Sequence, residues 1–222
     1  MSNVPTRHES SSWHAAYRAD ALVKRRVATH GQKLKRLGIL DLPRTTRILD
    51  VCCGEGEMLD MLQGAGFTSV MGLDVAADPQ AIQSLSHKPW RYVAGSATQF
   101  PFAKDSFDYI LCAHSLHHLW PLAQIKALIE NARQALKPGG TLALVDHYDS
   151  LQLRLALAVL LSPLAKLTNW SRLFREQHLE EKEQLFGYLN EWPQVHAAMI
   201  QAGFASAAYR RDLFFFYYTA RK

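Results

Sequence analysis

The chain is poor in cysteine and has no apolar run long enough to span a bilayer. Its three cysteines all lie in or beside apolar segments: Cys52, Cys53 and Cys112. So few thiols give no disulfide framework and fit a reduced cytoplasm. The most apolar stretch, residues 155–165, is interrupted by a serine–proline pair and is shorter than the ~20 residues that a membrane-spanning helix needs. We therefore expect a cytoplasmic protein.

The chain also lacks a strong charge imbalance and a targeting signal. A net charge of +5 permits an acidic partner without requiring one, so we expect no nucleic-acid partner. No basic segment followed by an apolar stretch stands near residue 1, which argues against a secretory signal peptide. The 222 residues suit one α/β domain with a full core and extra helices.

The most informative segment is an apolar strand that leads into a glycine-containing turn. Residues 47–57 have the sequence Arg-Ile-Leu-Asp-Val-Cys-Cys-Gly-Glu-Gly-Glu, with Asp50 near the end of the strand. Beyond Gly54, a second apolar run ends in Asp74. Glycines let the backbone approach a ligand closely, and the second carboxylate can accept both hydroxyls of a ribose. This pairing indicates a nucleotide-type cofactor on a parallel sheet.

The spacing of the turn argues against a dinucleotide. A dinucleotide-binding loop has a third glycine where this chain has Leu59, and it seats a pyrophosphate on the helix N-terminus. Glu55 and Glu57 would repel that pyrophosphate. Together with Asp50, these carboxylates suit a cofactor with positive charge. S-adenosylmethionine (SAM) carries a sulfonium and an ammonium group.

Five segments follow one another in a set order along residues 40–222. They are residues 50–56 (Asp-Val-Cys-Cys-Gly-Glu-Gly), 95–112, 115–119 (Ser-Leu-His-His-Leu), 135–144 and 202–204 (Ala-Gly-Phe). The second contains Phe-Pro-Phe and Asp-Ser-Phe-Asp, and the fourth contains Leu-Lys-Pro-Gly-Gly. In this order they resemble the segments of the class I SAM-dependent methyltransferases. Within that family they resemble the type 11 group, which is similar to enzymes of ubiquinone and menaquinone biosynthesis. The first segment resembles their motif I, D-x-G-x-G-x-G.

Two positions depart from the pattern of that family. Cys52 stands where the first glycine of motif I is usual. Because cysteine is small, we expect the loop to tolerate it with a slightly altered geometry. Ser96 stands where the family often has an aspartate that bonds the adenine amino group. A serine hydroxyl can bond there, more weakly.

Strand-like and helix-like segments alternate along the chain. We predict strands over residues 46–51, 68–73, 90–94, 107–112 and 140–146, and helices over 56–64, 78–86 and 121–136. The aromatic run 213–218 is predicted to be a strand buried on both faces. This order favours an α/β fold with a doubly wound, mostly parallel sheet, which the resemblance extends to seven strands. Ligands of such sheets bind beyond the carboxyl ends of the strands, where five candidates fall: Asp50, Asp74, Ser96, Ala113 and Asp146.

Two helical regions are expected beside this sheet. Residues 1–37 form an N-terminal helical extension with a basic face, which either packs on the domain or forms a lid with Tyr17 facing the ligand. Residues 38–222 form the methyltransferase domain, with a helical insert over 150–200. Its segment 151–165 either packs around the core, caps a lipophilic acceptor, or docks at a membrane surface.

The resemblance implies SAM as the cofactor and assigns the residues around it. The loop after the first strand would hold the methionine part, and the acid after the second strand would hold the ribose. Residues after the second and third strands would contact adenine, and those after the fourth would close over the methionine end. The full expected set is Asp50, Cys52, Cys53, Gly54, Glu55, Gly56, Asp74, Val75, Ser96, Ala97, Ala113 and His114.

Methyl transfer from a sulfonium is an in-line displacement, so an enzyme mainly aligns the donor with the nucleophile. A phenol, quinol or enol acceptor first loses a proton, and histidine suits this task near neutral pH. His117 is the favoured base and His147 the second candidate, with water as the alternative to both. His118 and Tyr148, with Tyr17, are expected to contact the acceptor. No metal ion is expected, because no carboxylate or cysteine stands at ligand spacing from the histidines.

The chain lacks the marks of two other methyltransferase classes. Residues 113–118 have no Asn/Asp-Pro-Pro turn, which enzymes that methylate adenine or glutamine amino groups carry. Cys112 lies within a strand rather than in the Pro-Cys setting of RNA cytosine methyltransferases. We therefore predict methyl transfer to a small lipophilic or aromatic acceptor, such as a quinol or a polyketide. The alternatives are a non-catalytic SAM-binding protein, or an enzyme that acts on RNA or protein through the basic N-terminal helix.

Overall fold

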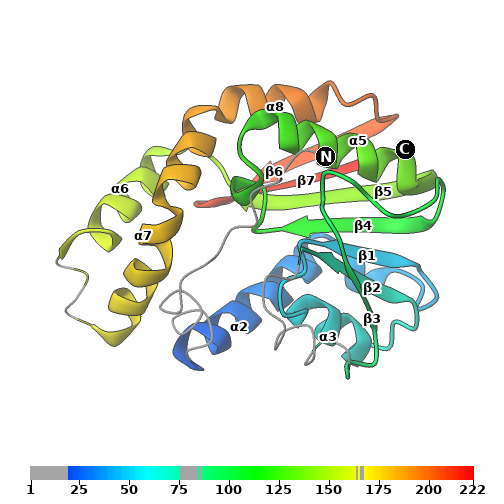
Figure 1. The fold of residues 1–222 in the computed structure, drawn as a ribbon, viewed down its shortest axis with the longest axis horizontal. Coiled ribbons are helices and arrows are strands. Elements are labelled where there is room, and N and C mark those ends of the chain that lie inside the picture. The colour runs from blue at the N-terminus through cyan, green and yellow to red at the C-terminus, as the bar shows by residue number, and fades with distance from the viewer. Residues whose placement is uncertain (1–19, 76–84, 86, 164, 166–167) are drawn as a thin grey trace.

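A seven-stranded sheet with strand order β3-β2-β1-β4-β5-β7-β6 runs through the middle of the protein (Figure 1). The structure, a computed structural model, describes residues 20–75, 85, 87–163, 165 and 168–222. The strands are β1 Ile48–Val51, β2 Val70–Asp74, β3 Arg91–Ala94, β4 Phe107–Ala113, β5 Leu136–His147, β6 Ser206–Arg211 and β7 Phe215–Arg221. Strands β1 to β5 pair in parallel, whereas β7 is antiparallel to both β5 and β6. The predicted α/β, doubly wound, mostly parallel sheet is confirmed.

Helices cover both faces of this sheet and its carboxyl end. They are α2 Asp20–Arg36, η1 Ile39–Asp41, α3 Glu57–Gly64, η2 His117–Leu119, α5 Leu122–Ala135, α6 Leu151–Leu160, α7 Asn169–Asn190 and α8 Trp192–Ile200. Side chains of α2, η1 and α3 pack against one face, and side chains of α5, α7 and α8 against the other. Helices α6 and α7 lie beyond the end of the sheet at which β4 and β5 finish (Figure 1).

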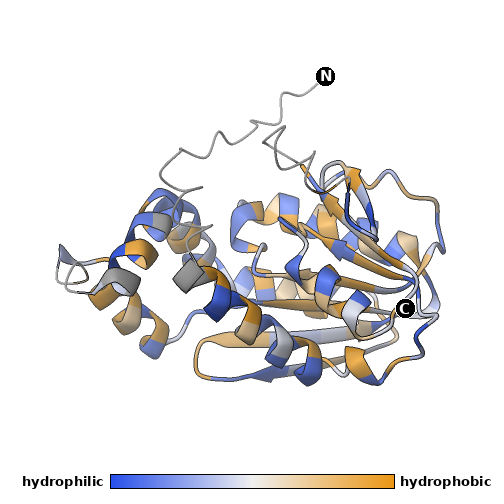
Figure 2. Ribbon diagram, turned by 90° about the horizontal axis from the view of Figure 1, so that it is seen from below, coloured by the Kyte–Doolittle hydropathy of each residue, from blue (hydrophilic) through white to orange (hydrophobic). Residues whose placement is uncertain are grey.

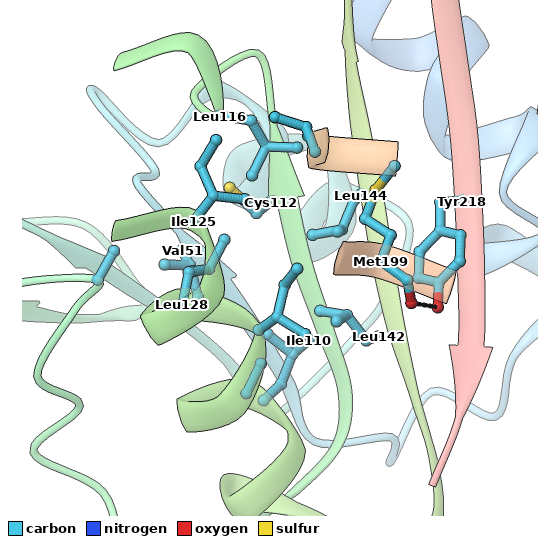
Figure 3. Packing of buried hydrophobic residues seen from close by; sticks show 14 of the residues in the cluster. Val51, Ile110, Cys112, Leu116, Ile125, Leu128, Leu142, Leu144, Met199 and Tyr218 are labelled. Atoms are coloured by element: carbon cyan, nitrogen blue, oxygen red, sulfur yellow. Dashed lines mark hydrogen bonds between the residues drawn. The ribbon is translucent and has the colours of Figure 1, made fainter. Parts of the chain in front are cut away.

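The strands are apolar because side chains on both of their faces are buried. In β1, Ile48 packs on the α2–α3 side, whereas Leu49 and Val51 pack on the α5 side. The strands in the middle of the sheet are accordingly mainly orange in Figure 2, while the helices around them alternate orange and blue. Figure 3 shows the α5 side, where the Tyr218 hydroxyl donates a hydrogen bond of 2.7 Å to the Met199 carbonyl and ties α8 to β7.

Several predicted element boundaries differ from the structure, and two of these differences have a clear structural cause. Strand β5 begins at Leu136 rather than at residue 140, because Leu136 pairs with Phe107 before an irregularity shifts the register. The aromatic strand begins at Phe215 rather than at Leu213. Asp212 Oδ1 accepts hydrogen bonds from the N–H groups of both Phe214 and Phe215, which forms a turn and leaves Leu213 54% exposed.

The remaining predicted elements agree with the structure where it describes them. Three consecutive residues of the aromatic strand are buried, as predicted for a strand covered on both faces: Phe216, Tyr217 and Tyr218. The N-terminal helix is described from Asp20 onward, and the predicted helix 78–86 lies almost wholly outside the described residues. The apolar segment 151–165 is helical only to Leu160. No helix in the described part of the chain is long and apolar enough to cross a membrane.

Candidate functional site

Three residues in the loop between β1 and α3 have a left-handed backbone conformation. Cys52, Gly54 and Gly56 have φ angles of 58°, 54° and 78°. The N–H of Cys52 donates to the carbonyl of Leu73 at 2.7 Å, so the loop bends toward the end of β2. The departure at Cys52 thus falls on a conformation that costs a non-glycine residue roughly 1–2 kcal/mol, which explains why glycine is usual there.

Two carboxylates lie beside this loop. Asp74 Oδ2 accepts a hydrogen bond of 2.8 Å from the Gly54 N–H. Asp50 is 4% exposed, and burial together with the charge of Asp74 raises the pKa of its carboxyl to about 8. A buried acid beside a second acid is a costly arrangement that a positively charged ligand would relieve. The loop therefore fits a cofactor with an ammonium and a sulfonium group.

The other expected cofactor residues line the neighbouring strand ends. Val75, directly after β2, is 60% exposed and so presents an apolar surface to a ligand. The Ser96 hydroxyl lies 2.8 Å from that of Thr98, within its own turn, whereas Ala97 is buried in the core. Gly56 has no room for a side chain, because a Cβ atom would lie 2.1 Å from the Trp90 ring. The expected contacts of Ser96 and Ala97 with adenine stay predictions.

Cys53, Glu55, Ala113 and His114 complete the expected set. Cys53 and Ala113 pack against the α2–α3 side of the sheet. Burial and the nearby charge of Asp50 raise the pKa of the Cys53 thiol, so this thiol stays protonated. Glu55 is half-buried within the loop. His114, directly after β4, has a φ of 58°, and its Nε2 atom is buried with no hydrogen-bond partner within the described structure.

His117 and Asp146 form a buried pair at the ends of β4 and β5. Nδ1 of His117 lies 3.0 Å from both carboxylate oxygens of Asp146, and its backbone N–H donates to Oδ2 at 3.2 Å. The N–H of His147 donates to Oδ1 at 2.7 Å. Asp146 is fully buried, and sequence analysis placed it at a strand end without assigning it a role. Because Asp146 accepts from Nδ1–H, Nε2 is the ring atom of His117 that accepts a proton.

Burial and charge set the ionisation of this cluster. Burial would raise the pKa of Asp146, but the charge and hydrogen bond of His117 outweigh it and hold that pKa well below its usual range. Burial lowers the pKa of His147 to about 4, and its Nδ1 lies 3.3 Å from the carbonyl of Phe214. His147 is therefore neutral at pH 7. Burial also lowers the pKa of His114.

Helix α2 brings the half-buried His30 and the buried Lys33 to the same end of the sheet. The His30 ring lies 5.8 Å from the His114 ring, and Lys33 Nζ lies 4.3 Å from the centre of the Phe215 ring. Phe215 in turn contacts His114, with ring centres 4.9 Å apart. Lys33 is 3% exposed, and burial lowers its pKa to about 8 against the opposing charges of Asp146 and Asp212.

Sequence analysis missed His30 and Lys33 because the basic residues of this segment suggested a face in solvent. The available signal was the spacing of His30, which stands four residues before the buried Leu34 and three before Lys33, since residues three and four apart share one face of a helix. Two ion pairs hold α2 in place. The Arg26 guanidinium binds the Glu57 carboxylate of α3, with Nε 2.7 Å from Oε2, and Arg36 binds Asp212 in the β6–β7 turn.

Helix α7 adds a buried acid beside the histidines. Glu181 is 2% exposed, and its Oε1 lies 3.8 Å from Nε2 of His118. Two groups of three potential metal ligands therefore occur within the described residues: His114, Asp146 and His147, and His117, His118 and Glu181, with ligand atoms within 4.8 Å of one another. The fold thus places the carboxylates of Asp146 and Glu181 beside the histidines, which their spacing in the sequence did not predict. The expected absence of a metal ion stays a prediction.

The residues expected to contact the acceptor differ in their burial and in their contacts. His118 is half-buried beside His117, with ring centres 4.2 Å apart. Tyr148 is buried, its hydroxyl donates to the carbonyl of Asp212 at 2.8 Å, and its ring lies beside Trp192, with ring centres 6.2 Å apart. Tyr17 lies outside the described residues.

Residues 48–140, which include the cofactor loop and strands β1 to β4, match a family described as "Methyltransferase domain". This match supports the resemblance of these residues to the class I SAM-dependent methyltransferases. SAM is accordingly the cofactor that this family implies, in agreement with the acidic loop.

Several methyltransferases resemble this chain. An uncharacterised methyltransferase of Synechocystis sp. is 36% identical over 100 residues, which cover 45% of this chain and 46% of the relative. A 2-phytyl-1,4-naphtoquinone methyltransferase of Thermosynechococcus vestitus is 36% identical over 126 residues, 53% of each chain. The chain thus spans about half the length of these curated relatives. A crystal structure of a putative SAM-dependent methyltransferase from Methanococcus maripaludis covers 98% of this chain with a TM-score of 0.61 at 16% identity, which shows the shared fold.

Proposed function

We propose that this methyltransferase transfers the methyl group of SAM to a small lipophilic acceptor with an ionisable hydroxyl, such as a quinol or enol. The observation that carries the proposal is the buried His117–Asp146 pair at the ends of β4 and β5. A histidine held by a carboxylate is a general base whose tautomer and orientation are fixed. The first product would be the methylated acceptor, and the second S-adenosylhomocysteine.

The cofactor residues divide between two strand ends. Asp50 would face the ammonium of SAM, and the left-handed loop at Gly54 and Gly56 would bring backbone close to the methionine part. Asp74 would bind the ribose hydroxyls through the carboxylate oxygen that does not bind Gly54. Val75 would pack on adenine. When bound, SAM supplies an electrophilic methyl group.

In the proposed reaction, the side chains of the protein transfer one proton. Nε2 of His117 accepts the proton of the acceptor hydroxyl, which leaves a nucleophilic oxyanion or enolate. The fully buried Asp146 carboxylate stabilises the resulting imidazolium and keeps Nδ1 protonated. His117 then releases the proton to solvent once the acceptor has left. His147, neutral at pH 7, would line the acceptor site rather than act as the base.

Two observations support a lipophilic acceptor. The relative from T. vestitus is named for a phytylated naphthoquinone. The insert between β5 and β6 is rich in apolar side chains on α6, α7 and α8, several of which pack at the carboxyl end of the sheet. We infer that α2 acts as a lid, that residues 150–200 act as a cap over the acceptor, and that the enzyme works in the cytoplasm.

The proposal is tested by following the methyl group. The purified protein is incubated with methyl-labelled SAM and a total lipid extract, and the label is separated into solvent-soluble and macromolecular fractions. We expect label in the solvent-soluble fraction, abolished by Asp74→Ala and retained by His87→Gln at an exposed histidine. Label confined to RNA or protein added in parallel would overturn the small-molecule acceptor.

A further inference from the structure

The exposed face of α6 is apolar. Leu151, Leu155 and Val159 are 70%, 59% and 62% exposed. Because they stand four residues apart, they form one stripe along the helix. Two leucines between them, Leu153 and Leu157, are buried against the core. The helix therefore presents aliphatic side chains both to the protein and to its surroundings, which is unusual for a surface helix.

This stripe lies at the end of the sheet that holds the candidate site. Helix α6 begins with the Ser150 side chain accepting a hydrogen bond of 3.2 Å from the Leu153 N–H, soon after His147 ends β5. In Figure 1, α6 is the outermost helix at this end, beyond α7. The Tyr148 hydroxyl bonds the β6–β7 turn at Asp212, next to the exposed Leu213.

One cationic group lies near the start of α6. The guanidinium of Arg211, an exposed residue at the end of β6, lies 5.7 Å from the centre of the ring of Tyr148, which stands three residues before the first residue of α6. The whole chain carries a net charge of +5. Aliphatic side chains beside arginine are the combination with which surface helices bind anionic lipid, through buried apolar area and attraction to headgroup phosphates.

We propose that α6 docks the protein on the surface of an anionic lipid bilayer. Leu151, Leu155 and Val159 enter the boundary between headgroups and acyl chains, and Arg211 meets headgroup phosphates. The helix lies in the plane of the membrane, since its 10 residues are too few to cross it. The inference goes beyond the proposed function, because it names a surface and a partner that methyl transfer does not require.

The size of the stripe favours lipid over a second copy of the chain. Stable protein–protein interfaces bury about 800 Å² on each partner and use 20–30 residues a side. One stripe of three aliphatic side chains is far smaller than this. A bilayer needs no matching surface, so a single short helix can contribute to binding with each side chain that it inserts.

Vesicle sedimentation tests the proposal without SAM or an acceptor, so its outcome is independent of the proposed reaction. The full chain is mixed with large vesicles of phosphatidylcholine with 30% phosphatidylglycerol, and with vesicles of phosphatidylcholine alone. We expect sedimentation with the anionic vesicles that falls at least tenfold in Leu155→Glu and several-fold in Arg211→Gln. The matched control is Gln152→Glu, which adds the same charge at an exposed position of α6 outside the stripe.

Three results would overturn the proposal. The first is wild-type protein that stays in the supernatant with both kinds of vesicle, and the second is Leu155→Glu that sediments as well as wild type. The third is a dimer, measured by light scattering, that Leu155→Glu converts to monomer while lipid binding is absent, since a second copy would then cover the stripe. Circular dichroism and melting temperature of each variant separate loss of binding from loss of fold.

Discussion

Cys52 occupies a backbone conformation that glycine adopts at lower cost. At a φ of 58°, its Cβ is crowded by its own backbone, whereas its side chain gains only partial burial against the core. We expect Cys52→Gly to raise the free energy of unfolding by up to about 1 kcal/mol, because relief of this strain exceeds the entropy that glycine adds to the unfolded chain.

Urea denaturation checks the prediction for Cys52. Cys53→Gly is the matched control, since Cys53 is not among the residues with positive φ and its side chain packs against the core. That control is expected to lower stability. Equal losses in both variants would show that the Cys52 thiol contributes more through packing than its backbone costs.

Asp50 should couple cofactor binding to pH. Its pKa is about 8 in the fold and about 3.9 in an unfolded chain, so the folded protein holds a proton that the unfolded chain releases. Its contribution to the free energy of unfolding therefore falls as the pH rises from about 4 to 8. A cationic ligand favours the ionised form, so SAM affinity should rise over the same range.

We expect Asp50→Asn to remove both effects. The variant should be more stable than wild type at pH 8, and its SAM affinity should be weak and independent of pH. Thermal melts and calorimetric titrations between pH 5 and 9 measure these quantities. Wild-type affinity that does not change with pH would contradict the placement of Asp50 beside the cation.

His117 and Asp146 should act as a unit in catalysis. His117→Gln is expected to lower the rate of methyl transfer 10²–10⁴-fold, the usual range for a general base, while SAM binding stays unchanged. Asp146→Asn should lower it comparably, and the double variant should be little worse than either single one. Single-turnover transfer of labelled methyl measures the rate. Full activity in His117→Gln would leave water as the base.

At the scale of elements, α2 is attached to the domain by an ion pair at Arg26, within the helix, and by another at Arg36, its last residue. Arg26 and Glu57 are only 16% and 15% exposed, so this pair is shielded from solvent and salt. Glu57 is the first residue of α3 and directly follows Gly56 of the cofactor loop. The position of α2 and the conformation of the loop are therefore linked.

We expect Arg26→Met to loosen α2 and to weaken SAM binding several-fold, because it leaves the Glu57 carboxylate half-buried without its main partner. The double variant Arg26→Met/Glu57→Gln should recover part of the affinity. Hydrogen exchange over residues 24–36 reports the loosening. Unchanged exchange with reduced affinity would point to a direct role of Arg26 in the site instead.

The sequence predicted those parts of the site that are local in the chain. Asp50, Gly54 and Asp74 follow apolar strands, and parallel strands bring their carboxyl ends together whatever the detail of their packing. The pairing of His117 with Asp146 joins residues 29 apart, and no local pattern encodes it. Glu181 reaches the site from α7, whose position depends on tertiary packing alone.

At the scale of the whole molecule, one core on each face of the sheet holds the site in place. Ile110 is fully buried in the middle of β4 on the α5 side (Figure 3). We expect Ile110→Ala to lower the free energy of unfolding by about 2–5 kcal/mol, from lost burial and the cavity that remains. Ile200→Ala, at a side chain that is 55% exposed, should change it by less than about 1 kcal/mol.

Chemical denaturation followed by both near-UV and far-UV circular dichroism measures these costs. The two signals should change together in a single transition, since β1, β4 and β5 contribute side chains to both faces of the sheet. Separate transitions would show that the two faces unfold independently.

The place of β7 in the sheet has a consequence for how the protein is made. This strand follows β6 in the chain, yet it lies between β5 and β6 in the sheet. A nascent chain can therefore assemble β1 to β5 while β5 still has an open edge, and β6 has no strand to join until residues 215–221 emerge. An mRNA truncated before the codons for residues 215–221 would yield a protein whose sheet has an exposed edge strand, and such an edge is prone to pair with another chain. Quality control during synthesis would thus recognise an interrupted product by its unpaired strand.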